Sequence, residues 1–326
     1  SGANLKAQGA TVMKPVVPFI ARMSAEERAE WMAQFERLMP QIDVRPLATM
    51  DAAERLSARV AIVANPDPAH LHELPGLVWV QSLWAGVERL LGELIDTDFA
   101  IVRMTDPQLA ETMAEAVLAF SLYLHRDIPL YLAQQREKIW AEALPRLAAD
   151  RHIGILGLGN LGKAAARRLL ANGFPVSGWS RTPAEVEGAE CFSGEEGLQR
   201  VLSRSDIVVV LLPLTPDTRG LLNTARLAML PRGAGLINFG RGPIVDQPAL
   251  LAALDEGHLS HAVLDVFAQE PLPVDNPCWS HPSVTVLPHI SAPTTPATAA
   301  RIVAANLSAY FERGEIPPAV DRQRGY

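Results

Sequence analysis

The sequence predicts an α/β protein with two open parallel sheets, and three observations support this prediction. The chain of 326 residues exceeds the size at which a single hydrophobic core keeps growing. Hydrophobic residues make up 48% of it and charged residues 20%, a composition typical of a globular protein. Short apolar runs alternate with helical segments in two series, one on each side of a long helical stretch. Because strands that alternate with helices form parallel sheets, we expect two α/β domains.

The first series begins with a strand predicted over residues 16–21. The segment Ser24-Ala-Glu-Glu27 is a capping box, and it predicts an amphipathic helix that runs toward Pro40. Three further short apolar runs are bounded by Pro, Asp or Gly, and we expect them to form strands over residues 42–46, 60–64 and 77–83. These four strands predict a small open sheet.

The second series follows a break at Asp106-Pro107. Residues 109–143 have helical spacing with little turn chemistry apart from Pro129, so we expect a connecting helix and then a second helix. From His152 onward, strand-like runs occur in IGILGLG, PVSGWSR, DIVVVLLP, AGLINFG, HAVLDVF and VTVLPHI. Near-continuous apolar runs are typical of a parallel sheet covered on both faces. A last helix is expected over residues 298–311.

Charge and cysteine content argue against several classes of function. The net charge is −7 and no dense Lys/Arg block occurs, so we expect no nucleic-acid partner. The longest apolar stretches, such as residues 207–212, are far shorter than the ~20 residues of a membrane-spanning helix, so we expect no membrane partner. Cys191 and Cys278 lack the spacing of a metal site and favour a reducing compartment. We therefore expect a cytoplasmic protein without a metal site.

A glycine-rich motif, GLGNLG over residues 157–162, follows the strand predicted at 152–156 and opens a helix at 163–170. In this context the first glycine permits a tight turn, the second lets the backbone approach a pyrophosphate, and the third lets the helix pack close to the strand. The helix N-terminus then presents free N–H groups to the phosphates. The alternative is an ordinary strand-to-helix turn. The motif predicts a Rossmann domain whose cofactor-binding residues are Gly157, Gly159, Asn160, Leu161 and Gly162.

The end of the second strand of this domain decides which dinucleotide is preferred. An acidic side chain there would bind the adenosine ribose and repel a 2′-phosphate, but the sequence has Trp179-Ser180-Arg181-Thr182. The hydroxyls of Ser180 and Thr182 can donate hydrogen bonds, and the Arg181 guanidinium can pair with a phosphate dianion. The sequence therefore predicts NADP(H) as the preferred cofactor, with NAD(H) as an alternative. Arg181 could instead be a solvated surface charge.

Arg241, Glu270 and His289 follow three successive strands of the same domain. Ligands of open parallel sheets bind outside the carboxyl ends of the strands, so these side chains can point into one crevice. Reduction of a 2-keto acid needs a cation for the carboxylate, a proton donor for the carbonyl oxygen, and a group that holds the donor. These residue types supply those functions. Alternatively, Arg241 caps a helix or forms an ion pair between domains, Glu270 belongs to a turn, and His289 is structural.

From Gly154 onward the sequence resembles the D-isomer-specific 2-hydroxyacid dehydrogenases. The resemblance rests on several segments in the same order: GLGNLG, LLPLTPDTRGLLN, INFGRGPIVDQPALLAAL, AVLDVFAQEPLP and LPHIS. Within that family it is most similar to the glyoxylate/hydroxypyruvate reductase A group, through SLWAGVE at residues 82–88, the WSRT segment and the closing VDRQRGY. The resemblance implies a Rossmann domain, residues 107–291, inserted in a smaller flavodoxin-like substrate domain, residues 1–106 and 292–326.

The resemblance also implies individual roles. Arg241 would grip the substrate carboxylate and keto oxygen, His289 would be the acid/base, and Glu270 would pair with His289. Other positions match binding residues of the family. Asp265 matches the residue that binds the cofactor carboxamide, Leu212 and Pro213 match the turn that packs under the cofactor, and Ala85 and Gly86 match the loop that binds the substrate. Trp84, next to that loop, is expected to form a wall of the substrate pocket, although a buried aromatic residue can also be simply part of the core. Ser180 departs from the family's usual ribose-binding aspartate, which puts NAD preference in doubt.

The expected function is NADPH-dependent reduction of glyoxylate and hydroxypyruvate to glycolate and D-glycerate, in the cleft between the two domains. Another specificity within the family is the first alternative, although Glu270 argues against a formate dehydrogenase, which has Gln at that position. The second is a nucleotide-sensing, corepressor-like binding protein, which the absence of an acidic residue at Ser180 disfavours. The resemblance suggests a homodimer in contact through the helices after Asp106.

Overall fold

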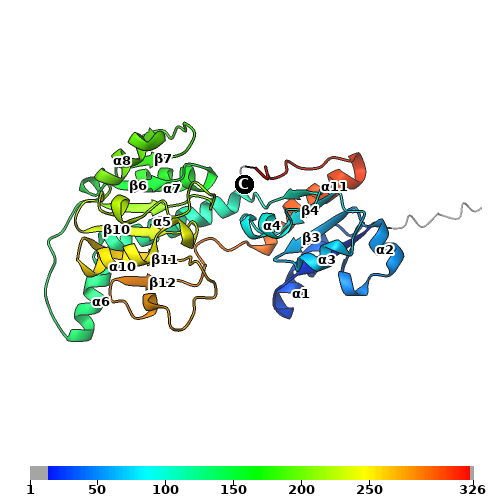
Figure 1. Ribbon diagram of the computed structural model, residues 1–326, viewed down its shortest axis with the longest axis horizontal. Helices are drawn as coiled ribbons and strands as arrows, with labels where there is room; N and C mark the ends of the chain where they lie inside the picture. The colour runs from blue at the N-terminus through cyan, green and yellow to red at the C-terminus, as the bar shows by residue number, and fades with distance from the viewer. Residues whose placement is uncertain (1–13, 324–326) are drawn as a thin grey trace, which may run out of the picture. The chain divides into compact units, whose positions relative to one another are not determined.

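A computed structural model describes residues 14–323. Residues 1–13 and 324–326, the first and last residues of the expected substrate domain, lie outside the described residues. The described chain divides into two compact units (Figure 1). One consists of residues 14–105 and 295–323, and the other of residues 106–294. Within the described residues no helix is long and apolar enough to cross a membrane.

The first unit contains a five-stranded sheet in the order β2-β1-β3-β4-β5, with every pair of neighbours parallel. This is the flavodoxin strand order, as predicted. The fifth strand was not predicted, and it has only three residues. The strands are β1 (Val16–Ala21), β2 (Asp43–Pro46), β3 (Val60–Ala64), β4 (Trp79–Ser82) and β5 (Ala100–Val102).

Helices cover both faces of this sheet. α1 begins with the predicted capping box: the Ser24 hydroxyl accepts from the Glu27 N–H, and the Glu27 carboxylate accepts from the Ser24 N–H. Trp31 and Phe35 on α1 pack with α11 against one face. Ile20 and Val80 face the opposite core. The α-helices are α1 (Ala25–Leu38), α2 (Ala52–Ser57), α3 (Pro68–His72), α4 (Glu88–Glu93) and α11 (Pro296–Arg313).

The second unit contains a seven-stranded parallel sheet in the order β12-β11-β10-β9-β6-β7-β8. Its first six strands in chain order follow the Rossmann order, and β12 extends that sheet by one strand. The six predicted strands are confirmed, and β8 was missed. The strands are β6 (Ile153–Leu156), β7 (Val176–Trp179), β8 (Glu190–Phe192), β9 (Ile207–Val210), β10 (Ala234–Asn238), β11 (Leu259–Leu264) and β12 (Val284–Val286).

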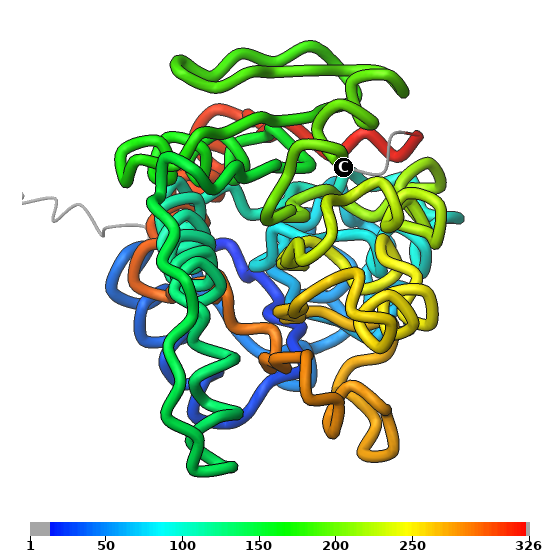
Figure 2. Tube along the Cα trace, turned by 90° about the vertical axis from the view of Figure 1, so that its left-hand side faces the viewer, coloured from blue at the N-terminus to red at the C-terminus, as the bar shows by residue number. Residues whose placement is uncertain are grey.

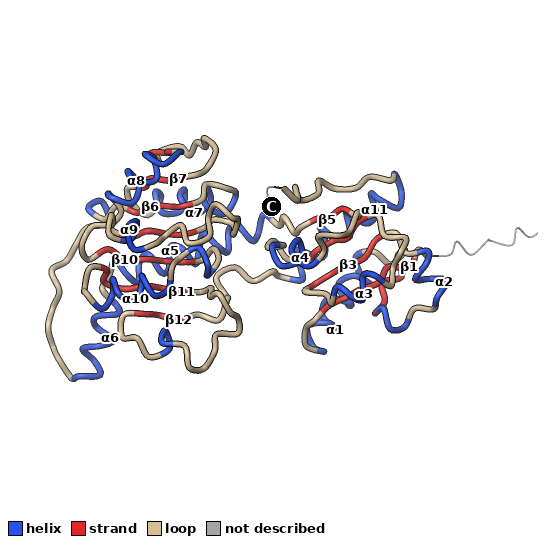
Figure 3. The backbone as a smooth tube through the Cα atoms, in the orientation of Figure 1, coloured by secondary structure: helices blue, strands red, loops and turns tan. Residues whose placement is uncertain are grey.

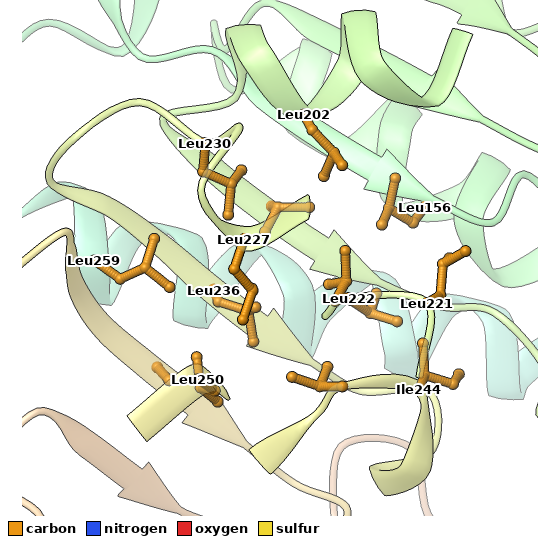
Figure 4. Packing of buried hydrophobic residues seen from close by; sticks show 14 of the residues in the cluster. Leu156, Leu202, Leu221, Leu222, Leu227, Leu230, Leu236, Ile244, Leu250 and Leu259 are labelled. Atoms are coloured by element: carbon orange, nitrogen blue, oxygen red, sulfur yellow. The ribbon is translucent and has the colours of Figure 1, made fainter. Parts of the chain in front are cut away.

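Helices also lie on both faces of the second sheet (Figure 3). Leucines form the core on one face, where Leu156, Leu202 and Leu236 are fully buried (Figure 4). On the other face α5 packs along α7 over Ile153 and Ile155. The α-helices are α5 (Pro107–His125), α6 (Ile128–Glu137), α7 (Asn160–Ala171), α8 (Gly194–Arg204), α9 (Thr224–Leu227) and α10 (Gln247–Asp255).

The second helix after the break ends earlier than its spacing suggests. α6 stops at Glu137 because Lys138 adopts a left-handed conformation with φ 56°. The following segment returns past α6 without regular structure until the short 3₁₀ turn Ala148–Asp150 (Figure 2). The Ala143 N–H donates to the Tyr131 hydroxyl at 3.1 Å, which ties this segment to α6.

Candidate active site

The glycine turn after β6 is shaped by close packing at two of its three glycines. Gly157 has φ 109°, and a Cβ there would lie 2.7 Å from the Leu211 carbonyl oxygen. A Cβ on Gly162 would lie 1.7 Å from the Gly157 carbonyl oxygen, so only glycine lets α7 pack on the turn. By contrast, nothing among the described residues lies within 4 Å of a Cβ on Gly159. The space beside Gly159 is therefore open, and in this motif a pyrophosphate approaches the backbone at the second glycine, so the turn fits a dinucleotide.

Gly159 is also the N-cap of α7, and it caps the helix without a side chain. The first N–H groups of an α-helix have no intrahelical acceptor, and they carry the positive end of the helix dipole. Asn160 and Leu161 begin this helix. The first turn of α7 can therefore hold phosphate oxygens through backbone N–H groups.

The segment after β7 folds back on itself. The Ser180 hydroxyl donates to the Thr182 carbonyl oxygen at 2.6 Å, and the Ser180 N–H donates to the Phe192 carbonyl oxygen at 3.1 Å. The Trp179 indole N–H donates to the Gly194 carbonyl oxygen at 2.8 Å. The Ser180 hydroxyl proton is thus used within the turn. Arg181 and the Thr182 hydroxyl remain the side chains of this turn with donors suited to a phosphate.

The turn at Leu212-Pro213, after β9, is held by two threonines that sequence reasoning did not single out. The Thr218 hydroxyl donates to the Pro213 carbonyl oxygen at 2.7 Å and accepts from the Thr215 N–H at 2.8 Å. Gly240 packs against the same turn, since a Cβ there would lie 2.8 Å from the Leu212 carbonyl oxygen. The ends of β9 and β10 are therefore locked together.

Arg241 follows β10, and the buried side chain of Asn238 sets the path of the chain there. The Asn238 amide nitrogen donates to the Arg241 carbonyl oxygen at 3.0 Å, and its amide oxygen accepts from the Gly240 N–H at 3.1 Å. After Arg241 the chain passes so close to Phe267 that a Cβ on Gly242 would lie 2.1 Å from the Phe267 carbonyl carbon. The turn that carries Arg241 therefore rests on the segment that leads to Glu270.

Glu270 and His289 form a direct pair. His289 Nδ1 lies 2.7 Å from Glu270 Oε2, and Glu270 Oε1 accepts from the Phe267 N–H at 2.9 Å. The hydrogen bond to Glu270 is the main cause that raises the pKa of His289 above its ordinary value, against the opposing effects of burial and of Arg241. Burial opposes ionisation of Glu270, but the bonds from His289 and Phe267 outweigh it and lower the pKa of Glu270. The pair therefore favours an imidazolium beside a carboxylate.

The backbone at His289 adopts the left-handed region, with φ 56°. For a residue other than glycine this conformation persists only where the surroundings impose it. Asp265, which is 2% exposed, imposes it here: its carboxylate oxygens accept from the Ile290 N–H at 2.7 Å and the Ser291 N–H at 2.9 Å. Asp265 thus anchors the loop of His289. Because each carboxylate oxygen has a second lone pair, Asp265 keeps acceptor capacity for a carboxamide.

The structure brings four of the expected site residues together in the second unit. Arg241, Asp265, Glu270 and His289 follow the carboxyl ends of three neighbouring strands, β10, β11 and β12. The expected substrate-binding residues Trp84, Ala85 and Gly86 lie in the first unit, directly after β4. Among the described residues, no group of three or more potential ligands could hold a metal ion.

A Rossmann-ordered sheet with a glycine turn on its first strand, and with an arginine and a His–Glu pair at its strand ends, defines an NAD(P)-dependent dehydrogenase. Comparison with known proteins agrees. The family model described as D-isomer specific 2-hydroxyacid dehydrogenase, NAD binding domain, matches residues 118–291. The chain belongs to the D-isomer specific 2-hydroxyacid dehydrogenases, as its motifs indicated.

Relatives match almost the whole chain. Glyoxylate/hydroxypyruvate reductase A of Yersinia enterocolitica is 36% identical over 307 residues, which are 92% of this chain and 97% of the relative. A D-isomer specific 2-hydroxyacid dehydrogenase from Xanthobacter autotrophicus Py2, solved with NADPH and MES, is 41% identical with a TM-score of 0.88, covering 95% of this chain and 99% of that one. The NADPH-dependent glyoxylate/hydroxypyruvate reductase of Sinorhizobium meliloti, solved with NADP and sulfate, is 35% identical with a TM-score of 0.86, covering 96% and 100%.

Proposed function

We propose that this protein reduces glyoxylate and hydroxypyruvate to glycolate and D-glycerate, with NADPH as the reductant. The observation that carries the proposal is the His289–Glu270 pair, 2.7 Å apart and within the electrostatic reach of Arg241. The relatives from Yersinia and Sinorhizobium are named for these substrates, which supports the choice of keto acid. Following the loss of NADPH absorbance with each keto acid tests the proposal. Tight binding of NADPH without turnover would favour the nucleotide-sensing alternative.

His289 is the proton donor in this proposal. NADPH, when bound, supplies a hydride for the carbonyl carbon of the keto acid. Since Nδ1 of His289 faces Glu270, the proton passes from Nε2 of the imidazolium to the carbonyl oxygen. Glu270 stabilises the charged imidazolium before the transfer and holds the ring in place through the bond from the Phe267 N–H. The same pair accepts the proton when a 2-hydroxy acid is oxidised.

Arg241 binds the substrate carboxylate and stabilises negative charge on the keto oxygen. A guanidinium presents a planar fork that matches a carboxylate, which an ammonium group does not. The first unit offers further donors: among the described residues, the N–H groups of Ala85 and Gly86 have no hydrogen-bond acceptor. We propose that these N–H groups take part in substrate binding. Asp265 accepts from the carboxamide of the cofactor with its remaining lone pairs.

The Glu270→Gln variant tests the role of the pair through pH. The pKa of His289 is raised, so the imidazolium persists at pH values where an ordinary histidine is already neutral, and reduction declines as pH rises through that raised pKa. Glutamine removes the negative partner, so the pKa of His289 falls. We expect partial activity and a pH profile of kcat for reduction whose decline is shifted downward. An unchanged or upward-shifted profile would show that Glu270 does not set the charge of His289.

The preference for NADPH is predicted from Arg181 and Thr182. One charge-assisted contact to a phosphate is worth roughly 1.5–3 kcal/mol, which corresponds to a preference for NADPH over NADH of at least about tenfold in kcat/KM. The double variant Ser180→Asp, Arg181→Ala should reverse the preference, because the new carboxylate binds the ribose hydroxyls and repels the phosphate. Thr182→Val, with Ser180 and Arg181 intact, measures how much of the preference for NADPH depends on the Thr182 hydroxyl. A wild-type preference for NADH would contradict the assignment.

We also propose that the protein is a cytoplasmic homodimer. α6 and the segment after it carry large apolar side chains in contact with solvent, and these are Leu130, Leu132, Ile139 and Trp140, the last 97% exposed. A second copy of the chain would cover them. Sedimentation velocity should give the mass of a dimer for the wild type and a smaller mass for Trp140→Asp. A wild-type monomer would contradict the proposal.

A further inference from the structure

Asn238 is the last residue of β10, and it is buried there with an exposed fraction of 1%. A buried amide costs stability unless its polar atoms have hydrogen-bond partners. Both polar atoms of this amide have their partners in the backbone just beyond the strand, at Gly240 and Arg241. The rest of the strand, residues 234–237, consists of apolar residues and one glycine. The side-chain bonds of Asn238 are therefore directed to the turn after the strand.

The Asn238 side chain holds the backbone on both sides of one peptide group. Its amide oxygen accepts from the Gly240 N–H at 3.1 Å, and its amide nitrogen donates to the Arg241 carbonyl oxygen at 3.0 Å. The peptide group that joins Gly240 to Arg241 lies between these two bonds. Because a peptide group is planar, bonds on either side of it leave its carbonyl little freedom to rotate. The direction of the Gly240 carbonyl is therefore fixed by Asn238.

The Gly240 carbonyl is bonded in turn to the guanidinium of Arg241. Arg241 Nη1 donates to the Gly240 carbonyl oxygen at 2.8 Å. Gly240 is itself packed closely, since a Cβ there would lie 2.8 Å from the Leu212 carbonyl oxygen. A guanidinium is rigid and planar, so a bond at Nη1 restricts the directions in which its other N–H groups can point. The orientation of the Arg241 fork thus depends on the peptide group that Asn238 holds.

We infer that Asn238 is a positioning residue for substrate binding: through the Gly240 carbonyl it orients the Arg241 guanidinium for the carboxylate of the keto acid. The inference rests on the proposed function, in which Arg241 binds that carboxylate. Asn238 acts through Arg241, so its contribution disappears when the planar fork is absent. Its contribution is large when the fork is present, because a misplacement of about 1 Å in a binding group can lower the rate about a hundredfold.

A double-mutant cycle with Asn238→Leu and Arg241→Lys tests the inference at saturating NADPH. Leucine branches at the same atom as asparagine but bonds to neither peptide group. In the wild-type background we expect Asn238→Leu to lower kcat/KM for glyoxylate at least about tenfold. The lysine ammonium has no planar fork to orient, so in the Arg241→Lys background the same replacement should cost no more than about twofold. Equal losses in the two backgrounds, or no loss in the wild-type background, would overturn the inference.

Asn172→Leu is the matched control. The Asn172 amide nitrogen also donates to a backbone carbonyl oxygen, that of Arg168 at 2.8 Å, but at the C-terminal end of α7, so its loss should leave kcat/KM unchanged. Thermal unfolding establishes whether Asn238→Leu is folded. If it is not, the cycle uses Asn238→Ala, which needs less space, and the same outcomes decide. Failure of the wild type to reduce either keto acid would contradict the proposed function instead.

Discussion

His289→Asn is expected to lower kcat for reduction of glyoxylate by at least about a hundredfold, because general acid catalysis by a positioned histidine contributes roughly 10²–10⁴-fold. Asparagine retains a polar side chain near Glu270 but cannot deliver a proton at neutral pH. The affinity for NADPH should change little, since His289 acts on the carbonyl oxygen and contributes nothing to the glycine turn. Steady-state kinetics and fluorescence titration with NADPH measure the two quantities separately.

The matched control for this variant is another histidine–carboxylate pair in the same unit. His281 Nε2 lies 3.1 Å from Asp255 Oδ1, so His281→Asn breaks a pair of the same chemistry away from the proposed site. It should leave kcat unchanged. Near-normal turnover in His289→Asn would show that His289 is not the proton donor, whatever the result for His281→Asn.

Arg241→Lys is the second large effect. Lysine keeps the positive charge but loses the planar fork, so the carboxylate is held by a point charge and the keto oxygen loses a directed donor. We expect kcat/KM for both keto acids to fall on the order of a hundredfold. KM rises because the bidentate grip on the carboxylate is lost, and kcat falls because the keto oxygen loses a donor. Initial rates over a wide range of keto acid concentrations, at saturating NADPH, separate KM from kcat.

Arg204→Lys provides the comparison. Arg204 also makes a two-pronged contact with a carboxylate, at 2.6 and 2.8 Å to Glu190, but on the surface of the second unit. Its replacement should leave KM for the keto acid unchanged and cost little stability, since exposed ion pairs contribute little. Equal effects of the two substitutions would show that Arg241 has no special role toward the substrate.

The fold could be predicted largely because its strands are buried on both faces. Runs such as Ile207–Val210 are uninterrupted and apolar, because helices cover both faces of the sheet and every side chain of such a strand is buried. β8 has an exposed Glu190 and only three residues at the edge of its sheet, so its sequence carries no such signal. β5 was missed for the same reason of length. Pairing with a neighbouring strand, which sequence periodicity does not report, makes these segments strands.

The shared position of Arg241, Asp265, Glu270 and His289 could be predicted because topology alone brings the ends of parallel strands to one edge. The contacts that hold them could not. The sequence gives no sign that Asn238, at the end of an apolar strand, has a special role, yet its side-chain amide bonds to the backbone of Gly240 and Arg241 and so fixes the turn that carries Arg241. Asp265 was expected to bind the carboxamide of the cofactor, and the bonds that the structure shows are instead to the loop of His289. Ser180 was expected to donate to a phosphate, but its proton goes to the Thr182 carbonyl oxygen. Each depends on side-chain directions that spacing does not determine.

The central claim is that His289, Glu270 and Arg241 direct a hydride from NADPH onto the keto carbon of a small 2-keto acid. The most direct test uses NADPH deuterated at the transferable position, on each face in turn, with glyoxylate as substrate and mass spectrometry of the product. Glycolate with deuterium on its hydroxyl-bearing carbon is expected from one of the two cofactors, and none is expected when His289→Asn replaces the wild type at matched enzyme concentration and short times. Glycolate without deuterium from either cofactor, or no glycolate at all from the wild type, would contradict it.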